Sequence, residues 1–310
     1  MDRKKIEELL DKSCADALVA WAQGRTIDRQ EAQKAMKDLR EGLRGYKRID
    51  YDREYIPPAY VIRYQLGHVY MAWEALSRLK DAMNFGTGGR NTLRVVDFGA
   101  GTSVGRIAAA LMASEAIEDN RSIDRITIEE FDTSRLMLGM GNLVWTAFCK
   151  EAKRSLAGTE LARAVSVIHH GRGQDTNWEN VRKVDCETWL TAFHVTYTNN
   201  NDLKEVINHL YQTIDPSGGA FSCHEGNFEK MRDVFPFTPV YNSSPRYYPI
   251  HEGKSGYYPL HEGKPDGCIK CSTAYIGDWA KRNGFWQGWN YRPYLQVKAC
   301  GLLIGPDIPF

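Results

Sequence analysis

The stretch that decides the fold reads Arg94-Val-Val-Asp-Phe-Gly-Ala-Gly-Thr-Ser-Val-Gly105, and it continues into an alanine-rich segment. The apolar residues at its start favour a β-strand, the glycines at positions 99 and 101 allow a tight turn with positive φ, and residues 108–112 favour a helix. In an open parallel sheet, a ligand lies beyond the carboxyl end of such a strand, beside the N-terminus of the next helix. The stretch therefore predicts a nucleotide-type ligand. Its spacing also fits dinucleotide binders, so the discrimination must come from downstream residues.

The composition predicts an ordinary globular protein. The 310 residues contain 40 lysines and arginines against 39 aspartates and glutamates, so no overall charge favours a polyanion, and nucleic acid is not expected as a partner. No apolar run approaches the roughly 18–20 residues that span a bilayer, so we expect a soluble, cytoplasmic protein with no membrane partner. Seven scattered cysteines favour reduced thiols. The oligomeric state stays open, a homodimer included.

The N-terminal part has helical periodicity. Apolar residues recur at helical spacings over about 2–24 and 28–43, and a third helix is predicted from Pro57-Pro58 to about Met83. A glycine-rich joint follows at residues 86–89. We therefore predict a helical cap or lid over residues 1–90 and a ligand-binding domain over residues 91–310.

Two further marks follow the opening strand. A second strand, over residues 124–132, ends in an acidic segment, where a carboxylate can accept both hydroxyls of a ribose. We assign this contact to Asp132 and keep Glu130 as the alternative. In a purely structural interpretation, Asp132 caps the following helix, 135–149. The other mark is the turn Pro216-Ser-Gly-Gly219, which leads into a fifth strand.

These three marks, in this order, resemble those of the class I S-adenosylmethionine-dependent methyltransferase superfamily. The similar elements are the Asp-x-Gly-x-Gly turn, the run Phe131-Asp-Thr-Ser-Arg-Leu-Met137 and the Pro-x-Gly-Gly turn. The resemblance covers roughly residues 93–226 and 273–304. It implies an α/β, Rossmann-like fold with a mostly parallel seven-stranded sheet flanked by helices, its last strand antiparallel. It also implies S-adenosyl-L-methionine as the cofactor.

The remaining elements follow in chain order. We predict a third strand over residues 164–169 with a loop at 170–175, and a fourth strand over 189–197. Later elements are predicted at residues 203–214 and 273–283 as helices, and at 285–291 and 294–304 as terminal strands.

The resemblance implies roles for individual residues. The expected cofactor contacts are Asp97, Gly99, Ala100, Gly101, Asp132, Gln174, Asp175 and Phe193. Among these, Gln174 and Asp175 are the candidates that read the adenine amino group. Three side chains at strand ends, His194, His224 and Glu225, are candidates for a general acid or base. A lone histidine is more often structural than catalytic, and Glu225 is equally suited to bind a substrate amine.

Tyrosines are concentrated outside the resemblance. The expected substrate contacts are Tyr55, Tyr64, Tyr197, Tyr247 and Tyr248. Tyrosines of the cap either pack in the core or, like Tyr51, Tyr55 and Tyr64, face the ligand as a lid. There, an aromatic face over a sulfonium gains on the order of 0.5–2 kcal/mol.

An insertion over about residues 226–272 contains a tandem duplication, 247–256 against 257–266. It offers the zinc-type residues His251, His261, Cys268 and Cys271. Because no second pair follows at a regular spacing, we expect no metal.

The resemblance thus implies that the protein is an enzyme of the transferase class. We expect a methyltransferase whose acceptor is a small molecule, either a metabolite or a natural product. A cap and an insertion that close over the site exclude water, which suits a metabolite. One alternative is a cyclase or lyase that consumes S-adenosylmethionine and releases methylthioadenosine. Another is a non-catalytic ribosome-assembly protein, because the cap helix and opening strand are also distantly similar to mitochondrial ribosome-assembly methyltransferase-like proteins.

Overall fold

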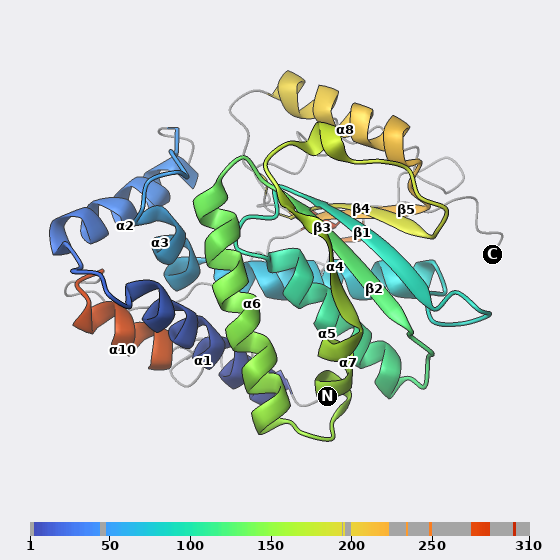
Figure 1. The fold of residues 1–310 in the computed structure, drawn as a ribbon, viewed down its shortest axis with the longest axis horizontal. Coiled ribbons are helices and arrows are strands. Elements are labelled where there is room, and N and C mark those ends of the chain that lie inside the picture. Colours follow the sequence, from blue (N-terminus) through green and yellow to red (C-terminus); the bar gives the residue numbers. More distant parts are fainter. Residues whose placement is uncertain are drawn as a thin grey trace.

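A five-stranded parallel sheet forms the centre of the molecule (Figure 1). The computed structural model describes residues 3–43, 48–193, 195, 200–222, 234, 248–249, 274–285 and 300–301. The strands are β1 (Thr92–Phe98), β2 (Arg125–Phe131), β3 (Ile168–Asp175), β4 (Thr188–Phe193) and β5 (Gly218–Ser222). Their order is β3-β2-β1-β4-β5, and all neighbours are parallel. The predicted α/β fold with a mostly parallel sheet is confirmed.

The expectation of seven strands in one sheet is not met in the described part of the chain. Most of the two predicted terminal strands, and most of the insertion, lie outside the described residues. Within them, β6 (Tyr248–Pro249) and β7 (Cys300–Gly301) pair antiparallel as a separate two-stranded sheet.

Helices cover both faces of the sheet because successive strand residues point to opposite sides. Val95 belongs to a core cluster shared with α4 (Gln65–Ala82) and α5 (Val104–Glu118), whereas Val96 belongs to a cluster shared with α8 (Asn200–Ile214). Figure 1 shows α8 on one side of the sheet and α5 on the other. Strands β1, β4 and β5 are buried along nearly their whole length, which is typical of a parallel sheet covered on both faces.

The N-terminal helices pack against this layer. Helix α1 (Arg3–Ala22) lies along α6 (Arg135–Ser155), and α10 (Ala274–Arg282) packs on α1 (Figure 1). The core cluster continues without a break from α1 to the sheet. The predicted division into a cap (1–90) and a ligand-binding domain (91–310) stays a prediction. The two parts share one hydrophobic core. None of the described helices combines the length and apolarity needed to cross a membrane.

The predicted starts of two helices, near residues 28 and 135, are confirmed, although the second helix continues past its predicted end at residue 149 to Ser155. The helix α2 (Arg29–Leu43) begins after Asp28, whose Oδ1 accepts the N–H groups of Gln30 at 2.8 Å and Glu31 at 3.3 Å. This is the arrangement expected of an N-cap aspartate. At α6, the N-cap is Ser134, whose Oγ accepts the N–H of Met137 at 3.2 Å.

Two other predictions are wrong. The sequence predicts a third strand at 164–169, but residues 164–167 are the end of helix α7 (Glu160–Val167). The third strand, β3, starts at Ile168 and includes the predicted loop at 170–175. Helix α7 buries Leu161, Ala164 and Val165, a helical spacing that a short apolar run does not reveal. The single helix predicted from residue 57 to 83 is two helices, α3 (Ile56–Arg63) and α4, which meet at Tyr64.

Candidate functional site

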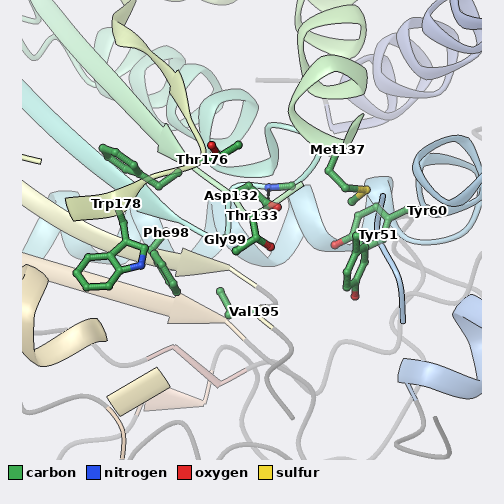
Figure 2. A pocket seen from close by; sticks show the side chains of 12 residues that line it. Tyr51, Tyr60, Phe98, Gly99, Asp132, Thr133, Met137, Thr176, Trp178 and Val195 are labelled. Carbon is green, nitrogen blue, oxygen red and sulfur yellow. Dashed lines mark hydrogen bonds between the residues drawn. The ribbon is translucent and has the colours of Figure 1, made fainter. Parts of the chain in front are cut away.

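A pocket lies at the carboxyl edge of the sheet. The chain leaves β1 toward β2 on one side, while β4 lies on its other side, so the strand order reverses there. Open α/β sheets bind ligands at such a point. The pocket contains about 640 Å³ of empty space, part of it open to solvent (Figure 2). Its lining residues are Tyr51, Tyr60, Phe98, Gly99, Gly101, Phe131, Asp132, Thr133, Met137, Thr176, Trp178 and Val195.

The glycine turn forms the floor of the pocket. Gly99 and Gly101 have φ angles of +69° and +54°, which confirms the predicted turn. A Cβ on Gly99 would approach Cγ2 of Val195 to 2.6 Å, so the turn has no room for a side chain there. The N–H groups of Gly99 and Ala100 both donate to the carbonyl of Phe131, at 2.7 and 3.1 Å. The end of β2 is thereby fixed to the turn after β1.

Asp132 lies in the pocket between the ends of β1 and β2. Its Oδ2 accepts the N–H of Gly101 and its Oδ1 accepts the N–H of Ser134, both at 2.8 Å. Burial raises the pKa of Asp132 to about 6, although these two backbone hydrogen bonds lower it. Because each carboxylate oxygen has two acceptor positions, one position on each remains for a ligand after these contacts. The cap of α6 is formed by Ser134, so Asp132 is not needed for it.

Glu130, the alternative to Asp132, does not line the pocket. It is fully buried and forms an ion pair with Arg106 of α5, whose Nε donates to Oε1 at 3.2 Å. His170 Nε2 lies 3.2 Å from Oε2. Burial alone would raise the pKa of Glu130, but hydrogen bonds with His170 and Arg106 lower it. Glu130 therefore serves an internal network on the α5 side of the sheet.

Asp97 lies beneath the turn. Its side chain is only 1% exposed, and its Oδ1 accepts the hydroxyl of Thr191 at 2.8 Å. A Cβ on Gly105 would come within 2.3 Å of Oδ2, so α5 packs directly on this carboxyl group. Burial raises the pKa of Asp97 to about 8. These contacts are with β4 and α5, and Asp97 is not among the lining residues, so its predicted cofactor contact stays a prediction.

Three other predicted cofactor contacts, Ala100, Phe193 and Asp175, are not among the lining residues. Ala100 and Phe193 are buried in the protein. The carboxylate of Asp175 accepts from Asn177 N and Asn180 Nδ2, at 2.9 and 2.8 Å, and points into its own loop. The side chain of Gln174 lies outside the described residues. Two residues that the sequence interpretation missed, Thr176 and Trp178, follow β3 and line the pocket instead.

The tyrosines of the cap that line the pocket are not the ones predicted as substrate contacts. The hydroxyl of Tyr55 accepts the N–H of Asp28 at 2.9 Å, and Tyr64 stacks on His68 with a centroid distance of 5.4 Å. Neither lines the pocket, whereas Tyr51 and Tyr60 do. In Figure 2 these two rings lie together beside Met137, at the end of the pocket away from Trp178. Sequence spacing gave no signal for this division, because Tyr55 bonds to a residue 27 positions away and Tyr64 stacks on His68 just after the junction of α3 and α4.

The remaining predicted residues fall elsewhere. His194, Tyr197, His224, Glu225 and Tyr247 lie outside the described residues, and so does the side chain of Tyr248. Their catalytic and substrate roles stay predictions. The four zinc-type residues of the insertion also lie outside. Among the described residues, no group of three or more His, Cys, Asp or Glu side chains could hold a metal ion.

Among the described lining residues of the pocket, the ionisable carboxyl group of Asp132 is not balanced by a lysine or an arginine. Besides burial, the carboxylate of Asp52 raises the pKa of Asp132, more strongly than Glu130 does. The arrangement suits a neutral or cationic ligand and opposes an anionic one.

No protein-family model and no curated protein matches the sequence. Among solved structures, the chain is similar to a magnesium protoporphyrin IX methyltransferase from Synechocystis PCC 6803 with bound SAH. That match has a TM-score of 0.35 and 14% identity, and covers 90% of this chain and 97% of that chain. A putative class I S-adenosylmethionine-dependent methyltransferase from Listeria monocytogenes matches with a TM-score of 0.36 and 10% identity, over 74% of this chain and 77% of that chain. Geranyl diphosphate C-methyltransferase from Streptomyces coelicolor A3(2) matches with a TM-score of 0.33 and 12% identity, over 98% of this chain and 97% of that chain.

Proposed function

We propose that the pocket binds S-adenosyl-L-methionine and that the protein is a class I methyltransferase whose acceptor is a small-molecule nucleophile. The observation that carries the proposal is the position of Asp132. Its carboxylate is held by the glycine turn, keeps an acceptor position on each oxygen, and faces a pocket at the strand-order reversal. A ribose with two adjacent hydroxyls matches this pair of acceptor positions.

The same geometry disfavours a dinucleotide. A pyrophosphate needs N–H donors from the glycine turn and tolerates no uncompensated negative charge beside it. Here the N–H of Gly101 is already engaged by the carboxylate of Asp132, and no described lining residue is cationic. S-Adenosylmethionine contains a nucleoside and a positive sulfonium but no phosphate, so it agrees with both features.

The lining residues suggest how this ligand is divided along the pocket. Phe98 and Trp178 provide aromatic surface for a base at one end (Figure 2). Asp132 would hold the ribose between this end and the glycine turn at Gly99 and Gly101. The amino-acid end would then lie toward Tyr51 and Tyr60.

The cofactor supplies an activated methyl group with a good leaving group, so the protein's main task is positioning. Holding a nucleophile in line with a reacting carbon can contribute roughly 7–11 kcal/mol. A proton acceptor is needed only where the nucleophile carries a proton. For this role we keep His194, His224 and Glu225 as proposals, and Tyr197, Tyr247 and Tyr248 as proposed substrate contacts.

Calorimetric titration with S-adenosylmethionine, S-adenosylhomocysteine and NAD⁺ tests the proposal. We expect both sulfur compounds to bind and NAD⁺ not to bind. Asp132→Ala should weaken binding by at least about tenfold, the size of one good charge-assisted contact. The control Asp119→Ala, at the exposed end of α5, should leave affinity unchanged. Equal affinity of the Asp132→Ala variant and the wild type would refute the assignment.

The product distinguishes methyl transfer from the alternatives. Incubation with S-adenosylmethionine and a small-molecule extract should yield S-adenosylhomocysteine. Release of methylthioadenosine would instead favour the cyclase or lyase. Absence of cofactor binding together with co-purification of RNA would favour the non-catalytic ribosome-assembly protein.

A further inference from the structure

A buried side chain of the N-terminal helices holds the turn after β1. Gln65, the first residue of α4, forms two hydrogen bonds with Thr102. Its Nε2 donates to the carbonyl of Thr102 at 3.1 Å, and its Oε1 accepts the hydroxyl of the same residue. Both residues are fully buried, so breaking these bonds would leave polar groups without partners inside the protein. The pair therefore fixes the position of the turn relative to α4.

The next residue of the turn has a strained backbone. Ser103 has a φ of +60° and a ψ of +37°, in the left-handed region that is unfavourable for a residue with a Cβ. Although Ser103 is the N-cap of α5, its side chain makes no capping hydrogen bond. Contacts from other elements must therefore hold this conformation.

Helix α6 supplies a second contact with the turn. A Cβ on Gly141 would lie 2.4 Å from Oγ of Ser103 and 3.0 Å from the carbonyl carbon of Thr102. A Cβ on Gly139, in the same helix, would meet nothing within 4 Å. The turn is thus enclosed between Gln65 of α4 and the backbone of α6 at Gly141.

This part of the turn is directly joined to the pocket. Gly101, which precedes Thr102, lines the pocket and donates its N–H to Oδ2 of Asp132. Gln65 does not line the pocket. A shift of Thr102 would nevertheless move the N–H that orients the carboxylate. Gln65 therefore influences the site through the turn, without contact with a ligand.

We propose that Gln65 is a positioning residue that holds the glycine turn in its strained conformation, so that α4 forms a fixed wall of the ligand site and not part of a lid that opens. This inference rests on the proposed function. Opening at α4 would break both bonds to Thr102. Ser103 would then be free to relax to a right-handed conformation, and the N–H of Gly101 would lose its alignment with Asp132.

Two measurements on the full chain test the inference. Calorimetry gives the affinity for S-adenosylmethionine, and NMR of protein labelled with ¹⁵N-glycine gives the hydrogen exchange of the Gly101 amide. Gln65→Met keeps the length of the side chain and removes both bonds. It should weaken the affinity by about 5- to 30-fold and accelerate the exchange of Gly101 by about tenfold or more.

A second substitution distinguishes positioning from lost packing. Glycine adopts the left-handed conformation readily, so Ser103→Gly removes the strain that Gln65 has to oppose. The double variant Gln65→Met/Ser103→Gly should recover most of the affinity and of the protection of Gly101. Ser103→Gly alone should bind like the wild type.

Matched variants control for general loosening of the helices. Gly141→Ala should weaken the affinity because its Cβ displaces Ser103, whereas Gly139→Ala should not. Ser77→Ala removes the hydrogen bond between α4 and Glu115 of α5, away from the turn, and should change neither affinity nor the exchange of Gly101.

A milder pair covers the case in which Gln65→Met does not fold. Thr102→Val removes only the hydroxyl and should weaken the affinity by about threefold or more, whereas Thr102→Ser keeps the hydroxyl and should bind like the wild type.

Wild-type affinity in Gln65→Met, no recovery on adding Ser103→Gly, or an equal loss in Ser77→Ala would overturn the inference and leave the proposed function intact. Failure of the wild type to bind S-adenosylmethionine would instead overturn the proposed function. The exchange of Gly101 in Gln65→Met would then still decide whether Gln65 holds the turn.

Discussion

The N–H of Gly101 donates a hydrogen bond of 2.8 Å to Oδ2 of Asp132, a residue 31 positions further along the chain. This contact joins the turn after β1 to the end of β2. The carbonyl of Phe131 reinforces the junction by accepting two N–H groups of the turn. The conformation of the turn and the orientation of the carboxylate are therefore coupled, so a change in the turn should affect ligand binding as well as stability.

Gly99→Ala tests the turn directly. An alanine there has an unfavourable positive φ, and its Cβ meets Val195 Cγ2 at 2.6 Å. The matched control is Gly158→Ala, because Gly158 has a φ of +80° with nothing within 4 Å of a Cβ. We expect the control to lose about 1 kcal/mol of unfolding free energy and Gly99→Ala to lose about 2–4 kcal/mol. Urea unfolding measures both. Equal losses would show that the contact with Val195 does not matter, and the double variant Gly99→Ala/Val195→Ala should recover part of the difference.

The pKa of about 6 for Asp132 predicts a pH-dependent affinity. A ribose requires the carboxylate form, so protonation of Asp132 competes with the ligand. Affinity for S-adenosylmethionine should be constant above about pH 7 and should fall below pH 6, approaching tenfold per pH unit. Binding near pH 6 should release protons, which calorimetry detects in buffers of different ionisation enthalpy. Asp132→Asn should bind weakly and without this dependence; the same pH profile in that variant would contradict the assignment.

The features that the sequence predicted correctly are those with local causes. The glycine turn needs positive φ at Gly99 and Gly101, and the helix predicted from about residue 28 begins at Arg29, directly after Asp28, whose Oδ1 accepts the N–H of Gln30. By contrast, the short apolar run 164–169 fits a strand or a helix equally, and only its packing against α5 and α6 makes it helical.

The site was predictable only in part for the same reason. Asp132 follows directly from the end of a strand. Tyr60 and Tyr64 differ in role because Tyr60 lines the pocket while Tyr64 stacks on His68 outside it, and that division depends on how α3 meets α4. Trp178 reaches the pocket from a short 3-10 helix after β3, an element that no periodicity marks.

Asp97→Asn tests the protonation state of the buried carboxyl group between β4 and α5. Burial raises the pKa of Asp97 to about 8 from its ordinary value of 3.8, so the folded protein prefers the neutral acid. Its contribution to stability is fully present below about pH 4 and is lost as the pH rises toward 8. An asparagine keeps an acceptor for Thr191 and carries no charge. The variant should therefore be more stable than the wild type at pH 8, by an amount on the order of 1 kcal/mol or more, with little difference at pH 4. Asp185→Asn, at an exposed residue, is the control, and an advantage of Asp97→Asn that does not grow with pH would refute the neutral form of Asp97 in the folded protein.

Glu130→Gln and Asp132→Asn together distinguish the structural carboxylate from the ligand-binding one. Glu130 is buried against Arg106, so loss of its charge leaves a guanidinium without its partner and should cost on the order of 3 kcal/mol of unfolding free energy. It does not line the pocket, so the folded fraction should bind S-adenosylmethionine within about threefold of the wild type. Asp132→Asn should show the opposite pattern, with weak binding and little loss of stability at pH 7.5, because burial opposes the charge of Asp132. Denaturant unfolding and calorimetry on the same preparations measure both quantities. A large loss of affinity in Glu130→Gln with none in Asp132→Asn would transfer the ribose contact to Glu130.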